Sequence, residues 1–242
     1  MVSVRSADFV ITMISFFLAY VFVVTFVGCF RAWVTDKMGD DSAMEAGYFT
    51  LNPLPHMDLV GLVCLFLFHI GWGNFNMPLN PARIVAANPI VRWIKLCIAY
   101  FSDAIGHIVL ATLAMATLLI MFGKSVIYLS AGMMLNGELS HMNFALNYPA
   151  SSSMSISVAL ILIASIYLNV FLAGINFVFR GLELFMIYLI EKAPQYAKYN
   201  NIATIFLYAI IVSIFVTPQL RLGLVMLISH WGSAIASLFG AA

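Results

Sequence analysis

Long apolar runs separated by short polar stretches organise this chain. Residues 9–30 are apolar for long enough to cross a bilayer, which takes about 20 residues of helix, and the helix is expected to continue to Lys37. The other long runs predict further helices at 93–122, 151–192 and 202–239, the last of which is interrupted at Thr217 and Pro218. The pattern predicts an all-α integral membrane protein with about five or six transmembrane helices.

The stretches between these runs predict loops and one unusually long helix. Residues 36–45 are polar and are expected to form a loop, and residues 125–150 are expected to form an extended loop carrying one short amphipathic helix. The serines at 151–153 predict an N-cap for the helix that follows. Because 151–192 exceeds one bilayer crossing, a tilt, a kink near Gly174 or Gly181, or a protrusion is expected.

Residues 50–89 do not fit the pattern of a simple membrane-spanning helix. Pro, Asn, Gly, His and Asp residues lie there on both sides of a short apolar run at 59–72. Irregular backbone at membrane depth is tolerated only where protein or water satisfies its polar groups. We therefore expect a re-entrant or interfacial segment at about 50–89, in which 59–72 either dips into the bilayer and returns or forms a thin spanning helix.

Composition supports a membrane protein and excludes some partners. Hydrophobic residues make up 63% of the 242 residues and charged residues only 9%, against roughly a quarter in soluble domains. The net charge of +1 provides no basic face for nucleic acid. No internal repeat is evident, so 1–242 is interpreted as a single polytopic domain whose partners are lipids and other membrane proteins.

Basic residues collect at 83–95 and at 192–198, and the positive-inside tendency places both regions in the cytoplasm and the loop at 123–153 outside. The N-terminal apolar run is too long for a signal peptide and is interpreted as a retained helix. Cys29, Cys64 and Cys97 lie inside apolar runs without metal-binding spacing, which is typical of buried small side chains.

The 50–89 segment resembles the intramembrane site-2 metalloprotease family. In that family a Leu-Asn-Pro and His-x-Asp segment is followed by a Gly-Trp turn and a Pro-x-Asn-Pro strand. The matching residues here, in the same order, are Asn52, Pro53, His56, Asp58, Gly71, Trp72, Pro78, Asn80 and Pro81. Gly39 and Asp40 lie where the family has a Gly-Asp pair after its first catalytic helix. The resemblance implies the fold of a polytopic protein of the bacterial inner membrane.

The residues that carry the family's chemistry are replaced in this chain. An H-E-x-x-H helix binds zinc through two His, and its Glu activates water. The corresponding positions here include Val27, Gly28 and Arg31, and Arg31 would place a permanent cation at a ligand position. The third ligand is an Asp, near which this chain has Glu183. We therefore expect no cofactor, no enzyme activity, and a structural, assembly or regulatory role in a larger membrane complex, binding a partner's transmembrane helix.

Two alternatives use the remaining polar residues. Asp103 and His107, and likewise Arg180 and Glu183, are spaced to share a helix face, and ionisable groups in membrane helices face the bundle interior or a cavity. They are interpreted as buried polar pairs that lock helices together. One alternative is an active intramembrane zinc metalloprotease with relocated ligands, drawn from His56, Asp58, His69, His107 and Glu183. The other is a small ion or proton transporter or channel subunit that uses these polar pairs.

Overall fold

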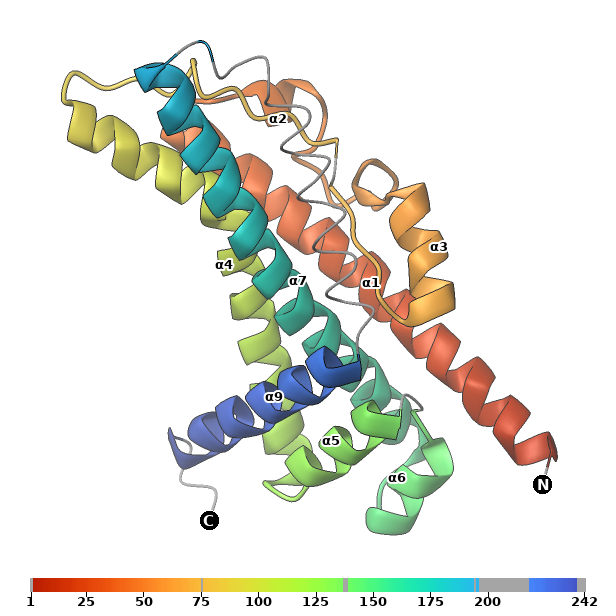
Figure 1. The fold of residues 1–242 in the computed structure, drawn as a ribbon. Helices are drawn as coiled ribbons and strands as arrows, with labels where there is room; N and C mark the ends of the chain where they lie inside the picture. Colours follow the sequence, from red (N-terminus) through yellow and green to blue (C-terminus); the bar gives the residue numbers. More distant parts are fainter. Residues whose placement is uncertain (1, 75, 137–138, 194, 196–217, 239–242) are drawn as a thin grey trace.

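Three long helices form the framework of the protein (Figure 1). The structure, a computed structural model, describes residues 2–74, 76–136, 139–193, 195 and 218–238. The framework helices are α1 (Val2–Met38), α4 (Pro89–Phe122) and α7 (Ser153–Lys192). In the part of the chain that is described, these three are long and apolar enough to cross a membrane. An all-helical fold is thus confirmed for the described residues, and its long apolar helices suggest a membrane protein, whereas the expected total of five or six spanning helices is not tested.

The helix boundaries follow from capping chemistry. The Asn88 side chain accepts a hydrogen bond from the Ile90 amide at 2.8 Å, and Pro89 occupies the first turn. For this reason α4 begins four residues before the predicted start. The Ser152 hydroxyl accepts from the Ser155 amide at 3.2 Å and starts α7, as the serine run predicted. The segment from Ser153 to Lys192 is one helix, which includes Gly174 and Gly181.

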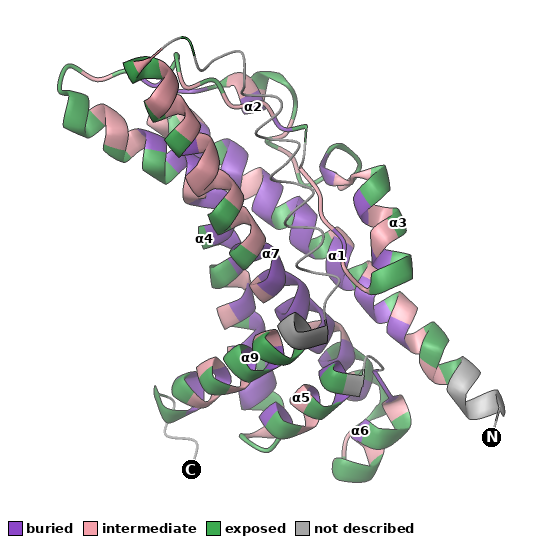
Figure 2. Cartoon of the chain, viewed as in Figure 1, coloured by how far each residue is buried: buried purple, intermediate pink, exposed green. Residues whose placement is uncertain are grey.

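The core lies where α1, α4 and α7 pack against one another (Figure 2). Small residues at these contacts let the helices approach closely, as membrane helices do. Gly106 of α4 packs on Val27 and Phe30 of α1, where a methyl group would already be tight. Large apolar side chains cover the outward faces, for example Ile120, which is 77% exposed. Such a surface suits lipid or another membrane protein rather than water.

Residues 126–147 differ from the prediction. Two helices form there, α5 (Val126–Asn136) and α6 (His141–Asn147), instead of one short helix in an extended loop. The Ser140 hydroxyl caps α6 by accepting from the Asn143 amide at 3.1 Å, a signal that the sequence interpretation did not use. Helix α6 packs against α7 near its start, and α5 packs on α4 and on α9 (Pro218–Leu238) (Figure 1). The part of the last predicted helix at 202–217 lies outside the described residues.

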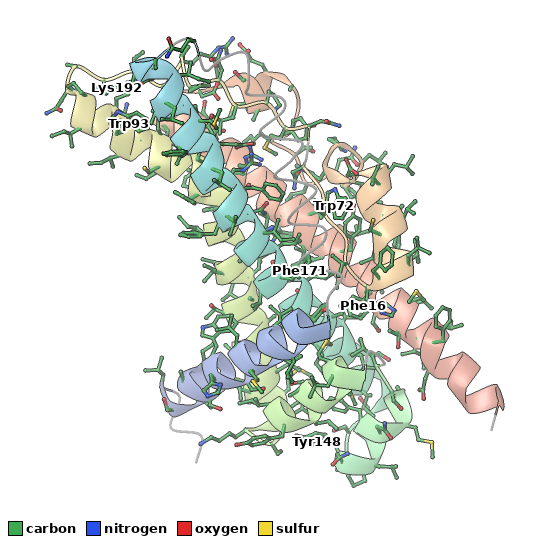
Figure 3. All side chains as sticks on the ribbon, viewed as in Figure 1. Phe16, Trp72, Trp93, Tyr148, Phe171 and Lys192 are labelled. Carbon is green, nitrogen blue, oxygen red and sulfur yellow. The ribbon has the colours of Figure 1, made fainter. Side chains whose placement is uncertain are left out.

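The start of α4 and the end of α7 lie together at the opposite end from α5 and α6 (Figure 1). An ion pair joins Arg92 Nη1 to Glu191 Oε1 at 2.9 Å, and the rings of Trp93 and Tyr188 meet at 6.0 Å. Figure 3 shows Trp93 and Lys192 at this end. The basic residues at 83–95 therefore gather with Lys192, which fits the predicted orientation, while 196–198 are not among the described residues.

Candidate functional site

The 50–89 segment lies along one side of α1. It follows α2 (Ser42–Glu45) and contains a 3₁₀ turn η1 (Leu54–His56) and the helix α3 (Leu59–Phe68). At ten residues, α3 is about 15 Å long and too short to cross a bilayer. The chain turns back after α3 at His69, whose φ is 57°. The length of α3 argues against the thin spanning helix, and whether the segment enters the bilayer and returns stays a prediction.

Hydrogen bonds from α1 hold this segment in place. The Tyr20 hydroxyl lies 2.9 Å from the Trp72 carbonyl, to which it donates, and accepts from the Asp58 amide at 3.2 Å. The Asp58 carboxylate caps α3 by accepting from the Gly61 amide at 2.9 Å. The Asn74 side-chain amide donates to the Val24 carbonyl at 2.8 Å. The irregular backbone is thus satisfied by protein, as membrane depth requires.

His56 lies at the centre of this contact, with no exposed surface. Its Nδ1 is 2.7 Å from Asn74 Oδ1, and its Nε2 is 2.9 Å from the Thr50 carbonyl. A Cβ atom on Gly28 would overlap both the His56 ring and the Asn74 side chain. Gly28 stands at the position of the family's glutamate, and the space that a side chain would need there is occupied by His56 and Asn74.

A second set of hydrogen bonds holds the part of the segment around Asn80. The buried Asp40 carboxylate accepts from the Asn80 amide at 2.7 Å and from the Ser42 hydroxyl at 2.6 Å. Nearby, Arg83 pairs with Glu45 and Asp41 at the surface. The hydrogen bond that Arg83 donates to Glu45, and next the one that it donates to Asp41, raise the pKa of Arg83 above its ordinary value. Asn80, flanked by Pro78 and Pro81, is therefore held at the end of α1.

A buried charge cluster joins the three framework helices. Asp103 of α4 lies at its centre, with its Oδ2 2.9 Å from Arg180 Nε of α7 and 3.6 Å from Arg31 Nη1 of α1. Arg180 also donates to Glu183 Oε2 at 2.8 Å. Arg31 is 2% exposed, and its Nε has no hydrogen-bond partner within the described residues. Two guanidinium groups thus share the Asp103 carboxylate.

His107 does not bond to Asp103, contrary to the pairing inferred from their spacing. Its Nδ1 lies 2.8 Å from Asn169 Oδ1, and the Asn169 amide donates to the Ser165 carbonyl at 2.9 Å and to the Ser165 hydroxyl at 3.2 Å. The pair predicted at Arg180 and Glu183 does form, but as part of the Asp103 cluster. The partners come from another helix, so helical spacing alone could not identify them.

The charge cluster does not fit a zinc ion. Zinc sites need three or four converging His, Cys, Asp or Glu ligands, and no such group of three exists among the residues that the structure describes. In the cluster each carboxylate already pairs with a guanidinium, and Arg31 stands at a ligand position. His56 and Asp58, considered as relocated ligands, are engaged with Asn74, Thr50 and Gly61 instead.

Several residues that build the site were missed by the sequence interpretation. Tyr20, Asn74 and Asn169 all supply hydrogen bonds between elements far apart in the chain. The usable signal was a polar side chain in an otherwise apolar run, because such groups in membrane segments need partners. Tyr20 and Asn169 satisfy that description, whereas Asn74 lies in a loop rich in Gly, Asn and Pro.

One curated protein is similar to this chain. It is the Bacillus subtilis (strain 168) protein named "Putative zinc metalloprotease YwhC", which is 30% identical over 86 residues. The match covers 32% of this chain and 39% of the relative. No family model matches, and no solved structure matches. The similarity points to a site-2 protease-like protein, as the motif order implied, and a Bacillus relative fits a bacterial origin.

The expectation that this chain is not an enzyme is contradicted by that comparison. The similar protein is named a zinc metalloprotease, which points toward a protease at low identity. The expectation rested on replaced motif positions, Val27, Gly28 and Arg31, and replaced residues alone do not distinguish a lost activity from one that is carried out differently.

Proposed function

We propose that this chain is a site-2 protease-like membrane protein that binds a transmembrane helix of another membrane protein along the 50–89 segment, within a larger membrane assembly. The observation that carries the proposal is that the two sides of this segment differ: one is hydrogen-bonded to α1 and the other exposes apolar side chains. Its inner side is fixed to α1 by the hydrogen bonds of Tyr20 and Asn74. Its outer side, on α3, presents large apolar side chains: Leu59, Val60, Val63, Phe66, Leu67 and Phe68.

The preformed shape of this segment supports a protein helix as the cover. Leu51 and Leu54 are also exposed beside α3, so the apolar face extends beyond the helix. A segment held in place before binding loses less conformational entropy when a partner docks. This supports a protein helix on this face, with lipid covering the remaining apolar surface.

Photocrosslinking tests the proposal. With a photoreactive amino acid at Val63 or Leu67, irradiation of intact membranes should give discrete protein adducts that mass spectrometry identifies as membrane proteins. The matched control is Ile120 of α4, which is also apolar and exposed but lies away from α3. Adducts with lipid alone at both α3 positions, as at Ile120, would refute the proposal.

Proteolysis of the bound helix is the second candidate function, and the name of the YwhC relative favours it. If the charge cluster is its centre, purified protein in liposomes should cleave a membrane-embedded substrate, and Asp103→Asn should reduce the rate by at least about 100-fold, the scale expected when a preorganised charged group is lost. Product masses and the zinc content of the protein are the measurements. Cleavage at an unchanged rate in Asp103→Asn would place the activity elsewhere.

A further inference from the structure

The first turns of α4 carry a lysine on a face that is otherwise apolar. Positions 91, 94, 95 and 98 fall within about 100° of one another around a helix, so their side chains leave it in similar directions. Three of them are exposed apolar residues, Val91 at 43%, Ile94 at 53% and Ile98 at 40%. The fourth is Lys95, which is partly exposed. Such an apolar face suits lipid, so we expect the Lys95 side chain to lie beside lipid molecules.

The protein does not balance the charge of Lys95. Its Nζ contacts the Val85 carbonyl oxygen at 3.4 Å, which is long for a hydrogen bond, and an ammonium group has three N–H donors. Within the described part of the chain no carboxylate lies within 4 Å of this Nζ. Arg92 in the same turn differs, because it donates to the Ile84 carbonyl at 3.1 Å and pairs with Glu191 at 2.9 Å. The Lys95 ammonium therefore keeps N–H groups for a further acceptor.

The length of α4 places Lys95 near the boundary between acyl chains and headgroups. With 34 residues, α4 is about 51 Å long, and a helix of that length centred in a hydrocarbon core of about 30 Å extends about 10 Å beyond it at each end. Lys95 lies about 9 Å along the helix from Pro89. Trp93, labelled in Figure 3, packs on Tyr188 at the same level, as aromatic side chains do at membrane interfaces.

From these observations we propose that the face formed by Val91, Ile94, Lys95 and Ile98 binds an anionic phospholipid. The phosphate accepts hydrogen bonds from Lys95 Nζ, and an acyl chain lies along the three apolar side chains. A phosphate supplies both the missing acceptor and the counter-charge. A lipid with a net negative charge is favoured over a zwitterionic one, in which the cationic group of the headgroup offsets the charge of the phosphate. The proposal is independent of the partner helix proposed for α3.

Lipid photocrosslinking from this face tests the proposal. The full-length protein, with a photoreactive amino acid in place of Ile94, is reconstituted in bilayer discs that contain equal amounts of phosphatidylglycerol and phosphatidylcholine with the same acyl chains. Mass spectrometry of the adducts should show phosphatidylglycerol in about fivefold excess, which corresponds to about 1 kcal/mol for one lysine beside an anionic headgroup. Lys95→Gln should reduce the ratio to about one, whereas Lys95→Arg should keep the excess.

Two controls make the measurement specific. Lys37→Gln should keep the excess, because Lys37 is already paired with Asp36 at 3.1 Å. The same photoreactive group at Ile108, which is as exposed as Ile94 but lies in the middle of α4, should label both lipids equally.

Three results would overturn the proposal. One is equal labelling of the two lipids from position 94 in the otherwise unchanged protein, and another is an undiminished excess of phosphatidylglycerol in Lys95→Gln. The third is loss of the excess on adding millimolar inorganic phosphate at constant ionic strength, because the site would then take a soluble anion rather than a lipid.

Discussion

Asp103→Asn should destabilise the protein by about 3–5 kcal/mol, because it leaves two buried guanidinium groups without their shared counterion. Asp103 is the carboxylate that both Arg31 and Arg180 approach, at 3.6 and 2.9 Å. Asparagine has the same size, so the loss reports charge rather than packing. Equilibrium unfolding in detergent or bilayer discs measures it.

Two matched variants separate this effect from a general sensitivity to mutation. Arg31→Met should cost far less than Asp103→Asn, or even stabilise, because the pair of Asp103 with Arg180 stays intact and a buried cation with an unpartnered Nε is removed. Glu191→Gln, in the partly exposed pair with Arg92, should change stability by about 0–1 kcal/mol. Equal losses in all three variants would argue against a charge cluster centred on Asp103.

Gly61→Ala should separate α3 from the backbone of Trp72, against which Gly61 packs. A Cβ atom at Gly61 would overlap the Trp72 carbonyl, which is backbone that cannot rotate away and also accepts from Tyr20. The expected cost is at the upper end of overpacking effects, about 3 kcal/mol. Faster amide exchange and protease cleavage over 50–81, with the framework helices unchanged, would show that the damage is local.

Gly174→Ala is the control for that substitution. Gly174 lies inside α7 with nothing within 4 Å of a built Cβ, so alanine should stabilise the helix by about 0.5–1 kcal/mol through its better helix propensity. A similar destabilisation by both alanines would mean that loss of glycine flexibility, rather than the Trp72 contact, is responsible.

Features governed by local chemistry were predictable. The span at 9–37, the serine cap before α7 and the irregular nature of 50–89 all follow from hydropathy, capping and the cost of unsatisfied backbone. The failures have a common origin. The start of α4 was placed late and α6 was not separated from the loop predicted at 125–150, because the capping roles of Asn88 and Ser140 were not recognised.

The pattern of apolar runs, through the cost of burying backbone and charge in lipid, by itself determined the helical class, the long apolar helices suited to a membrane and the irregular segment after the first of them, but left open whether that segment spans. Which polar groups meet was decided only by the tertiary structure. Asp103 could in principle pair with His107 on its own helix, yet it pairs with Arg180 and Arg31 from two others. Helical spacing specifies a face, whereas the packing of α1, α4 and α7 selects the partner that this face meets.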